Sequence, residues 1–180
     1  MKAIIMAGGK GTRIASVNSQ VPKPMIPILG KPILLYQIEN LKKQGMLDFV
    51  LVCGHLKEVI SDYFKDGSEF GVNIEYEMED KPLGTAGALS RFRDRMDDDF
   101  FLINGDIIFD IDIGRMLDFH RKNNALATLF THPNAHPYDS SLIACDGRGM
   151  ITAWKTKEED RGWMKNLVNA GIHLLSNRIF

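Results

Sequence analysis

Short apolar runs alternate with amphipathic runs along the first three quarters of the chain. The apolar runs, which are typical of buried strands, are residues 2–6, 49–53, 72–77, 100–104 and 126–131. The amphipathic runs, which are typical of helices, are residues 32–44, 56–65, 84–96 and 113–123. Alternation at this spacing favours βαβ units. We therefore expect an α/β fold in which helices flank a Rossmann-like, mostly parallel sheet.

The pattern changes after about residue 138. Three short apolar runs, 141–145, 151–154 and 167–174, are separated by turn-forming pairs such as Asp146-Gly147. Such a pair between two strands favours an antiparallel hairpin. We expect this part to form a short antiparallel extension, or an addition at the sheet edge, within one domain spanning residues 1–180.

Composition excludes several classes of partner. With 22 basic and 23 acidic residues the net charge is −1, so no strongly basic surface is expected for nucleic acid or anionic membranes. Cys53 and Cys145 lie far apart without a CxxC pair, which argues against a disulfide framework or a zinc knuckle. The first apolar run is too short for a signal peptide, and no stretch is long enough to span a bilayer. The sequence predicts a cytoplasmic protein.

The first apolar run leads into AGGKGTRI, residues 7–14. Glycine lets a ligand approach the backbone, and free N–H groups after a strand form an anion-binding concavity to which Lys10 and Arg13 add charge. The loop matches neither a P-loop nor a dinucleotide fingerprint, because Gly11 follows Lys10 and Ile14 stands where a third glycine is required. We interpret it as a phosphate cradle, with a strand exit that binds no ligand as the alternative.

Asn104-Gly105-Asp106 follows the fourth apolar run. Ligands of open parallel sheets bind beyond the carboxyl ends of the strands, so we expect this turn and the glycine loop to share one site. The segment 16–31 is rich in proline and is expected to be extended, with Lys23 held stiffly between Pro22 and Pro24.

Five motifs occur in order along the chain: AGGKGTR, VPKPM at 21–25, PLGTAGAL at 82–89, NGD at 104–106 and NAG at 169–171. This series resembles the sugar-1-phosphate nucleotidylyltransferases over nearly the whole chain. The segments LINGDIIFDID and THPNAHPYDS resemble, more narrowly, the D-glycero-D-manno-heptose 1-phosphate guanylyltransferases. Some of those enzymes are fused to a haloacid-dehalogenase-type phosphatase, so the resemblance raises a fused or partner phosphatase as well. The oligomeric state is not predicted.

The resemblance implies the nucleotide-diphospho-sugar transferase fold and a Mg²⁺-dependent reaction. In that reaction a nucleotidyl group passes from a nucleoside triphosphate, expected to be GTP, to a sugar-1-phosphate, expected to be heptose-1-phosphate, and pyrophosphate is released. The alternatives are a mannose-1-phosphate guanylyltransferase and a glucose-1-phosphate nucleotidylyltransferase. A non-catalytic nucleotide-sugar-binding regulatory module is the alternative from a different class.

The resemblance also implies roles for individual residues. The implied catalytic residues are Arg13, Lys23 and Lys157. The implied nucleotide-binding residues are Ala7, Gly8, Gly9, Gly11, Thr12, Glu79, Pro82, Gly84 and Thr85. The implied sugar-binding residues are Asp139, Ser140, Asn169 and Gly171, and the implied Mg²⁺ ligand is Asp106.

Side-chain chemistry agrees with three of these roles. The planar guanidinium of Arg13 suits the β- and γ-phosphates, and Mg²⁺ prefers a carboxylate such as Asp106 together with substrate phosphates. A carboxylate only accepts hydrogen bonds, and guanine offers two adjacent donors, so Glu79 favours GTP. The alternative is that Glu79 belongs to an exposed acidic run with Glu75, Glu77 and Asp80.

The chain departs from the family pattern in three places. Thr156 replaces the usual acid before Lys157, which leaves Lys155 as an alternative grip on the sugar phosphate. Asp139 replaces a glycine after Tyr138. The family normally continues through a further helix and strand that supply a second aspartate to the metal, so we expect the domain to be truncated at its C-terminal end.

Overall fold

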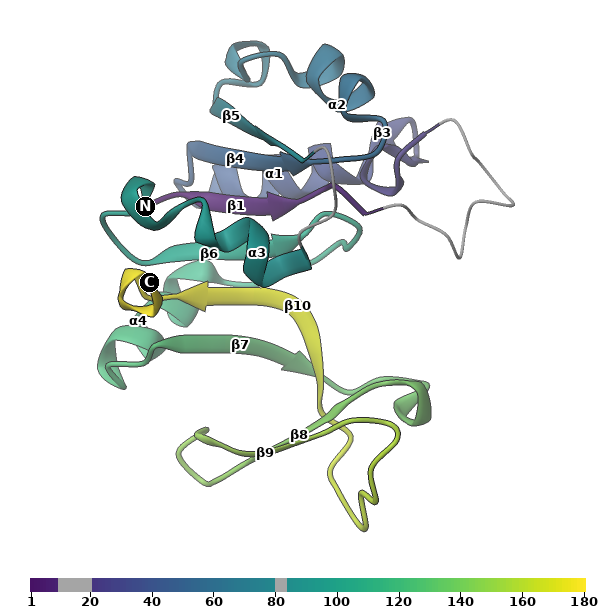
Figure 1. Ribbon diagram of the computed structural model, residues 1–180, viewed down its shortest axis with the longest axis vertical. Coiled ribbons are helices and arrows are strands. Elements are labelled where there is room, and N and C mark those ends of the chain that lie inside the picture. The colour runs from purple at the N-terminus through teal and green to yellow at the C-terminus, as the bar shows by residue number, and fades with distance from the viewer. Residues whose placement is uncertain (10–20, 80–83) are drawn as a thin grey trace. The chain divides into compact units, whose positions relative to one another are not determined.

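The computed structural model describes residues 1–9, 21–79 and 84–180 and divides into two compact units (Figure 1). The first unit comprises Met1–Thr128 and His173–Phe180, and the second comprises Leu129–Ile172. The described part confirms the predicted α/β class: a mostly parallel sheet carries helices, and two small antiparallel sheets accompany it.

The main sheet has six strands in the order β5-β4-β1-β6-β10-β7. Their bounds are β1 Ala3–Met6, β4 Asp48–Cys53, β5 Asn73–Met78, β6 Phe100–Asn104, β7 Ala127–His132 and β10 Val168–Leu175. β1 pairs in parallel with β4 and with β6, and β4 pairs in parallel with β5. The carboxyl ends of these four strands therefore meet at one edge, as the alternation of runs predicts.

The position of β10 corrects the sequence analysis, which assigned residues 167–174 to an antiparallel extension or an edge addition. β10 instead lies inside the main sheet, between β6 and β7, and its arrow in Figure 1 runs opposite to that of β1. Its last residues, Leu174 and Leu175, are both buried, as expected for a strand that is covered on both faces. Apolar periodicity identifies such a strand but does not say between which neighbours it pairs.

In the described part of the chain, four α-helices connect the strands: α1 Ile33–Lys43, α2 Lys57–Phe64, α3 Gly84–Ser90 and α4 Ile113–Lys122. α1 starts directly after Pro32, and Gly45 follows its end with a φ of 87°. At the start of α4 the Asp112 side chain accepts a hydrogen bond from the Arg115 N–H at 2.9 Å, which caps the helix.

The predicted helix over residues 84–96 is wrong in its second half. α3 ends at Ser90, and a 3-10 turn, η3 (Arg93–Arg95), follows it. Phe92 and Met96 are buried in the core, while Arg95 pairs with acidic side chains of β5. Burial of these two apolar side chains and the arginine pairing hold a turn where the local pattern alone allows a longer helix.

The core of the first unit is packed on both faces of the sheet. One face carries Ile4, Val50, Val52, Phe100 and Leu102, which cluster with Ala88, Phe92 and Met96 and with Leu175. Their neighbours along the strands point to the other face, because side chains of a strand alternate. In Figure 1 α3 lies in front of the sheet and α1 behind it, so both faces are covered.

The remaining described elements are short. In the first unit, η1 (Lys23–Met25) precedes an antiparallel pair of β2 (Pro27–Ile28) and β3 (Lys31–Pro32), and η2 (Ser68–Phe70) and η5 (Asn177–Ile179) are further 3-10 turns. In the second unit, η4 (Pro137–Asp139) precedes an antiparallel pair of β8 (Leu142–Cys145) and β9 (Ile151–Lys155). The β8–β9 pair confirms the predicted hairpin.

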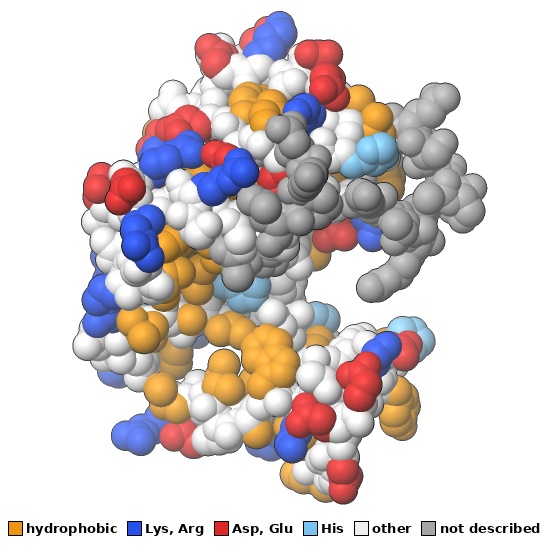
Figure 2. Space-filling view, in the orientation of Figure 1, with side chains coloured by type: hydrophobic (Ala, Val, Ile, Leu, Met, Phe, Trp, Pro, Cys, Tyr) orange, Lys and Arg blue, Asp and Glu red, His pale blue; other side chains and the backbone are white. Residues whose placement is uncertain are grey.

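The surface carries both signs of charge. On the face that Figure 2 shows, acidic and basic side chains are interleaved. Lys2, Arg91 and Arg95, for example, pair with Glu75 and Glu77. None of the helices in the described part of the chain has the length and apolar character that crossing a membrane requires.

The two cysteines are expected to differ sharply towards a thiol reagent. Burial raises the pKa of the Cys53 thiol to about 12, whereas Cys145 is exposed. At pH 8 only about one Cys53 thiol in ten thousand is then ionised, and the thiolate is the reacting species. A colorimetric thiol assay should count one fast thiol in the native protein and two after denaturation. Two equally fast thiols in the native protein would contradict the burial of Cys53.

Candidate functional site

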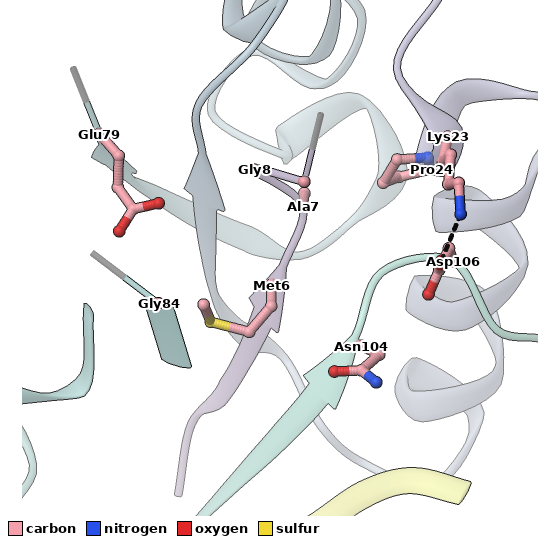
Figure 3. Close-up of a pocket in the computed structure, with 10 residues that line it drawn as sticks. Met6, Ala7, Gly8, Lys23, Pro24, Glu79, Gly84, Asn104 and Asp106 are labelled. Atoms are coloured by element: carbon pink, nitrogen blue, oxygen red, sulfur yellow. Dashed lines mark hydrogen bonds and ion pairs between the residues drawn. The ribbon is translucent and has the colours of Figure 1, made fainter. Parts of the chain in front are cut away.

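A cavity of about 250 Å³ opens at the carboxyl ends of β1 and β6 in the first unit (Figure 3). Its lining comprises Met6, Ala7, Gly8, Gly9, Lys23, Pro24, Glu79, Gly84, Asn104 and Asp106. The start of the glycine loop and the Asn-Gly-Asp turn thus meet at one edge of the sheet, as the sequence predicts. We call this cavity the strand-end pocket.

Gly8, which lines the strand-end pocket, lies in close contact with Gly54. A Cβ atom on Gly54 would lie 2.9 Å from the Gly8 carbonyl oxygen, and a Cβ atom on Gly8 would lie 3.1 Å from the Gly54 nitrogen. Close approach of the ends of β1 and β4 therefore explains the glycine at position 8. Gly9 differs, because a Cβ atom there would meet no described atom within 4 Å. Its backbone is open to a ligand, which is what a phosphate cradle needs.

Glu79 lies on one side of the strand-end pocket, just after β5. Its N–H donates to the Cys53 carbonyl at 2.7 Å, which fixes its backbone beside the end of β4. One carboxylate oxygen, Oε1, is buried and has no hydrogen-bond partner among the residues that the structure describes. A buried oxygen without a partner is costly, so Glu79 presents an acceptor suited to a ligand that donates.

Glu79 differs from Glu75 and Glu77, two members of the acidic run to which the alternative assigned it, while Asp80 lies outside the described residues. Glu75 and Glu77 are paired with basic side chains, Glu75 with Lys2 and Arg95 and Glu77 with Arg91 and Arg95. These hydrogen bonds lower the pKa of the Glu75 carboxyl below its usual value, with the Lys2 bond contributing most. Glu79 instead lines the pocket. Its predicted contact with the base stays a prediction.

Lys23 and Asp106 lie on the opposite side of the pocket from Glu79 (Figure 3). Lys23 Nζ and Asp106 Oδ2 are 3.5 Å apart, and both side chains are partly exposed. An ammonium group and a carboxylate side by side can hold phosphate charge and a hard cation, respectively. The structure therefore brings the predicted catalytic lysine and the predicted metal ligand together.

Lys23–Met25 forms a 3-10 turn, which corrects the expectation of an extended segment at these three residues. Pro27–Ile28 and Lys31 are extended as expected, and residues 16–20 lie outside the described residues. The Met25 N–H donates to the Pro22 carbonyl at 2.8 Å, and the Ile26 N–H donates to the Lys23 carbonyl at 3.1 Å. The fixed φ of proline suits such a turn as well as an extended segment. Pro22 and Pro24 are both buried, so Lys23 is held stiffly, as predicted, but by a turn.

Gly105 brings the Asp106 turn against β1. The Gly105 N–H donates to the Met6 carbonyl at 3.0 Å. A Cβ atom on Gly105 would lie 2.9 Å from the Met6 carbonyl oxygen and 3.1 Å from Pro24 Cγ. A side chain of any size would therefore push this turn away from both β1 and the segment that carries Lys23.

The single carboxylate of Asp106 fits a metal ion that is bound mainly by the phosphates of the nucleotide. Within the described ranges, no group of three or more His, Cys, Asp or Glu side chains is arranged to hold a metal. Mg²⁺ is commonly bound through one or two carboxylates, with phosphates and water completing its coordination. Asp106 supplies one such carboxylate, partly exposed at the pocket. The predicted role of Asp106 is thus compatible with a metal–nucleotide complex.

Several predicted site residues are not placed. The nucleotide-binding residues Gly11, Thr12 and Pro82, the catalytic residue Arg13 and the loop residue Lys10 lie outside the described residues. Thr85 lies in the first turn of α3, directly after Gly84, which lines the pocket with a φ of 69°. The roles of these residues stay predictions.

The predicted sugar-side residues belong to the second unit. Asp139 is exposed in η4, and Ser140 accepts a hydrogen bond from Asn134 at 2.8 Å. In β10 the Asn169 side chain accepts from the Gly171 N–H at 3.0 Å. Lys157 is exposed after β9, and Lys155, the alternative, lies 3.4 Å from Glu159. Their roles towards a sugar phosphate stay predictions.

Sequence reasoning missed two residues that hold lining residues of the strand-end pocket in place, Gly54 and Gln37, and it named Gly105 only as a member of the Asn-Gly-Asp turn. Gly54 could have been found from its position, because a glycine directly after a predicted parallel strand falls at the same sheet edge as the glycine loop. Gln37 could have been found as well, because it is a polar residue on the apolar face of a predicted helix. It is 1% exposed and donates to the Asn104 and Ile107 carbonyls on either side of Asp106.

Comparisons with known proteins agree with this geometry. A protein-family model described as Nucleotidyl transferase matches residues 2–180. The chain is 34% identical to the UTP–glucose-1-phosphate uridylyltransferase of Synechocystis sp., covering 99% of this chain and 50% of that protein. It is 36% identical to the D-glycero-alpha-D-manno-heptose 1-phosphate guanylyltransferase of Campylobacter jejuni, covering 100% of this chain and 78% of that protein.

The fold has a solved counterpart as well. The crystal structure of HddC from Yersinia pseudotuberculosis complexed with GMP-PN superposes with a TM-score of 0.80 at 25% identity. That match covers 99% of this chain and 77% of HddC. The chain spans about half the length of the first curated relative named above. From the family match over nearly all of its residues, we conclude that the chain belongs to the nucleotidyl transferase family.

Proposed function

We propose that the chain transfers a guanylyl group from GTP to a sugar-1-phosphate, with heptose-1-phosphate as the preferred acceptor, and that it releases pyrophosphate. The observation that carries the proposal is the strand-end pocket, in which Lys23 and Asp106 face Glu79 across open backbone at the end of β1. One side offers charge compensation for phosphates, and the other offers an acceptor for a donating base. We place the reaction in the cytoplasm, and a fused or partner phosphatase stays a prediction.

The reaction needs positioning and charge compensation more than a general base. An oxygen of the sugar phosphate is already ionised and attacks the α-phosphorus, and the bond from that phosphorus to the β-phosphate oxygen breaks. Lys23 would balance the negative charge gathered at the α-phosphate. Asp106 would hold Mg²⁺, which when bound neutralises charge on the triphosphate.

Two observations support guanine as the base. The two carboxylate oxygens of Glu79 form an acceptor pair at the edge of the pocket. Oε1 is buried without a partner among the described residues, and Oε2 lies 3.3 Å from the position that a Cβ atom on Gly8 would take. Guanine offers two adjacent donors to such a pair, whereas uracil offers one ring N–H. Two relatives point the same way: the Campylobacter enzyme is named a guanylyltransferase, and HddC was solved with GMP-PN. The uridylyltransferase relative makes UTP with glucose-1-phosphate the competing substrate pair.

The proposal is tested by pyrophosphate release with Mg²⁺. Each common nucleoside triphosphate is paired in turn with heptose-1-phosphate, mannose-1-phosphate and glucose-1-phosphate. Release confined to GTP with heptose-1-phosphate is the expected result. Release with UTP and glucose-1-phosphate instead would overturn both the base and the sugar, while the reaction class would stand.

Replacing Glu79 by glutamine is expected to lower kcat/KM for GTP at least about tenfold, with little change for UTP. The substitution keeps the side-chain size but turns one acceptor into a donor that opposes the guanine N–H groups. Glu77→Gln is the matched control, because Glu77 lies two residues before Glu79, in β5, but pairs with Arg91 and Arg95. An unchanged ratio of GTP to UTP use in Glu79→Gln would show that Glu79 does not read the base.

A further inference from the structure

Three amide side chains, two on α1 and one at its C-terminal cap, hold the loop between β6 and α4. They are Gln37, Asn40 and Gln44, spaced three and four residues apart and therefore on one face of the helix. We call them the amide ladder. Each donates a hydrogen bond to a backbone carbonyl of residues 104–111, and the Ile113 N–H donates to Gln44 Oε1 at 2.9 Å.

Gln37 holds the part of this loop that carries Asp106. Its Nε2 group donates to the Asn104 carbonyl at 2.8 Å and to the Ile107 carbonyl at 2.6 Å. Both hydrogens of the amide are thereby used, one on each side of Asp106. Asn40 and Gln44 act farther along the loop, on the Phe109 and Ile111 carbonyls at 3.3 and 2.9 Å.

The surroundings of Gln37 argue against a purely stabilising role. Its buried neighbours on α1 are apolar: Ile33, Leu34, Ile38 and Leu41. Its Oε1 atom is buried without a hydrogen-bond partner among the described residues. A buried amide that leaves one oxygen unpaired gains little stability over an apolar side chain of the same size. Its distinct effect is to fix two carbonyls in place.

We propose that Gln37 is a positioning residue for the metal ligand of the reaction, holding Asp106 where it meets Lys23 and the metal-bound phosphates. The inference rests on the proposed function, because it assigns Gln37 a task in the same site. Hydrogen bonds that orient a ligand commonly contribute about ten- to a hundredfold to metal affinity. Gln37 acts on the backbone around Asp106, and it does so from both sides.

The test compares Gln37→Met with Gln44→Met in the full chain. Each variant keeps the bulk of the side chain and removes the amide bonds at one end of the ladder. Mn²⁺ binding is titrated by electron paramagnetic resonance with GTP and without a sugar phosphate, so that no turnover occurs, and urea unfolding gives the stability of each variant. The Mg²⁺ concentration for half-maximal pyrophosphate release is then measured with heptose-1-phosphate.

Gln37→Met is expected to weaken Mn²⁺ binding and to raise the half-maximal Mg²⁺ concentration, each about tenfold. Gln44→Met is expected to change both by less than about twofold, because its bonds lie at the far end of the loop, although it loses at least as much stability as Gln37→Met. Equal effects of the two variants on metal binding, or no effect of Gln37→Met, would overturn the proposal.

Failure of the Gln37 proposal can be told apart from failure of the proposed guanylyl transfer. If the unsubstituted protein binds no Mn²⁺ with GTP and releases no pyrophosphate, the proposed function fails. Amide hydrogen exchange over residues 104–108 then decides the role of Gln37 by itself. Faster exchange in Gln37→Met than in Gln44→Met supports its hold on the Asp106 turn, and equal exchange overturns it.

Discussion

Replacing Asp106 by asparagine is expected to lower kcat for pyrophosphate release about a thousandfold. Asparagine keeps the size of the side chain but loses the negative charge that a hard cation prefers. Without the metal, the negative charge of the triphosphate is no longer neutralised. We expect this loss to raise the activation free energy by roughly 4 kcal/mol, which lowers kcat by about a factor of a thousand. The described residues offer little to replace the Asp106 carboxylate, because no group of three or more His, Cys, Asp or Glu side chains among them is arranged to hold a metal.

The folded state should tolerate this substitution. Asp106 and Lys23 form a partly exposed pair at 3.5 Å, and such a pair contributes about 0–1 kcal/mol to stability. The melting temperature should therefore fall by no more than about 3 °C. Asp110→Asn is the matched control, because Asp110 is an exposed aspartate of the same loop outside the strand-end pocket. Steady-state kinetics and thermal unfolding of both variants measure these effects. Full turnover in Asp106→Asn would remove Asp106 from the metal site.

The meeting of Lys23 and Asp106 is the part of the site that follows from sequence with the fewest assumptions. A parallel sheet brings the carboxyl ends of its strands to one edge, so a turn after β6 must lie near the loop after β1. Two prolines make the segment around Lys23 stiff in any local conformation. The 3-10 turn that Lys23 adopts was not predictable, because proline fits it and an extended segment equally well.

What the sequence leaves open depends on contacts between residues far apart in the chain. Gln37 and Asn104 are 67 positions apart, and nothing local to α1 says which backbone a buried amide will hold. Gly54 is required only because Gly8 lies against it. The same holds for β10, whose buried pattern is compatible with an edge or an interior position until its neighbours are known. The geometry around the strand-end pocket thus depends on residues that no motif contains.

Replacing Gly105 by alanine is expected to damage stability and turnover together. The new methyl group would lie 2.9 Å from the Met6 carbonyl oxygen and 3.1 Å from Pro24 Cγ. Neither neighbour can move cheaply, because one is the backbone of β1 and the other is a buried proline ring. Overpacking of this kind costs about 1–3 kcal/mol in the free energy of unfolding.

The effect on turnover follows from what lies on either side of Gly105. Asp106 is the next residue, and Pro24 is next to Lys23, so relief of the clash must shift one or both charged groups. A shift of about 1 Å in such groups is enough to lower kcat roughly a hundredfold. Urea unfolding and pyrophosphate release measure the two effects. Gly147→Ala is the control, because a Cβ atom there meets nothing within 4 Å, and it should change stability by less than about 0.5 kcal/mol. If Gly105→Ala were as stable and active as the unsubstituted protein, the Asp106 turn would have room to move. The conclusion that Gln37 and Pro24 hold this turn in a fixed position would then be wrong.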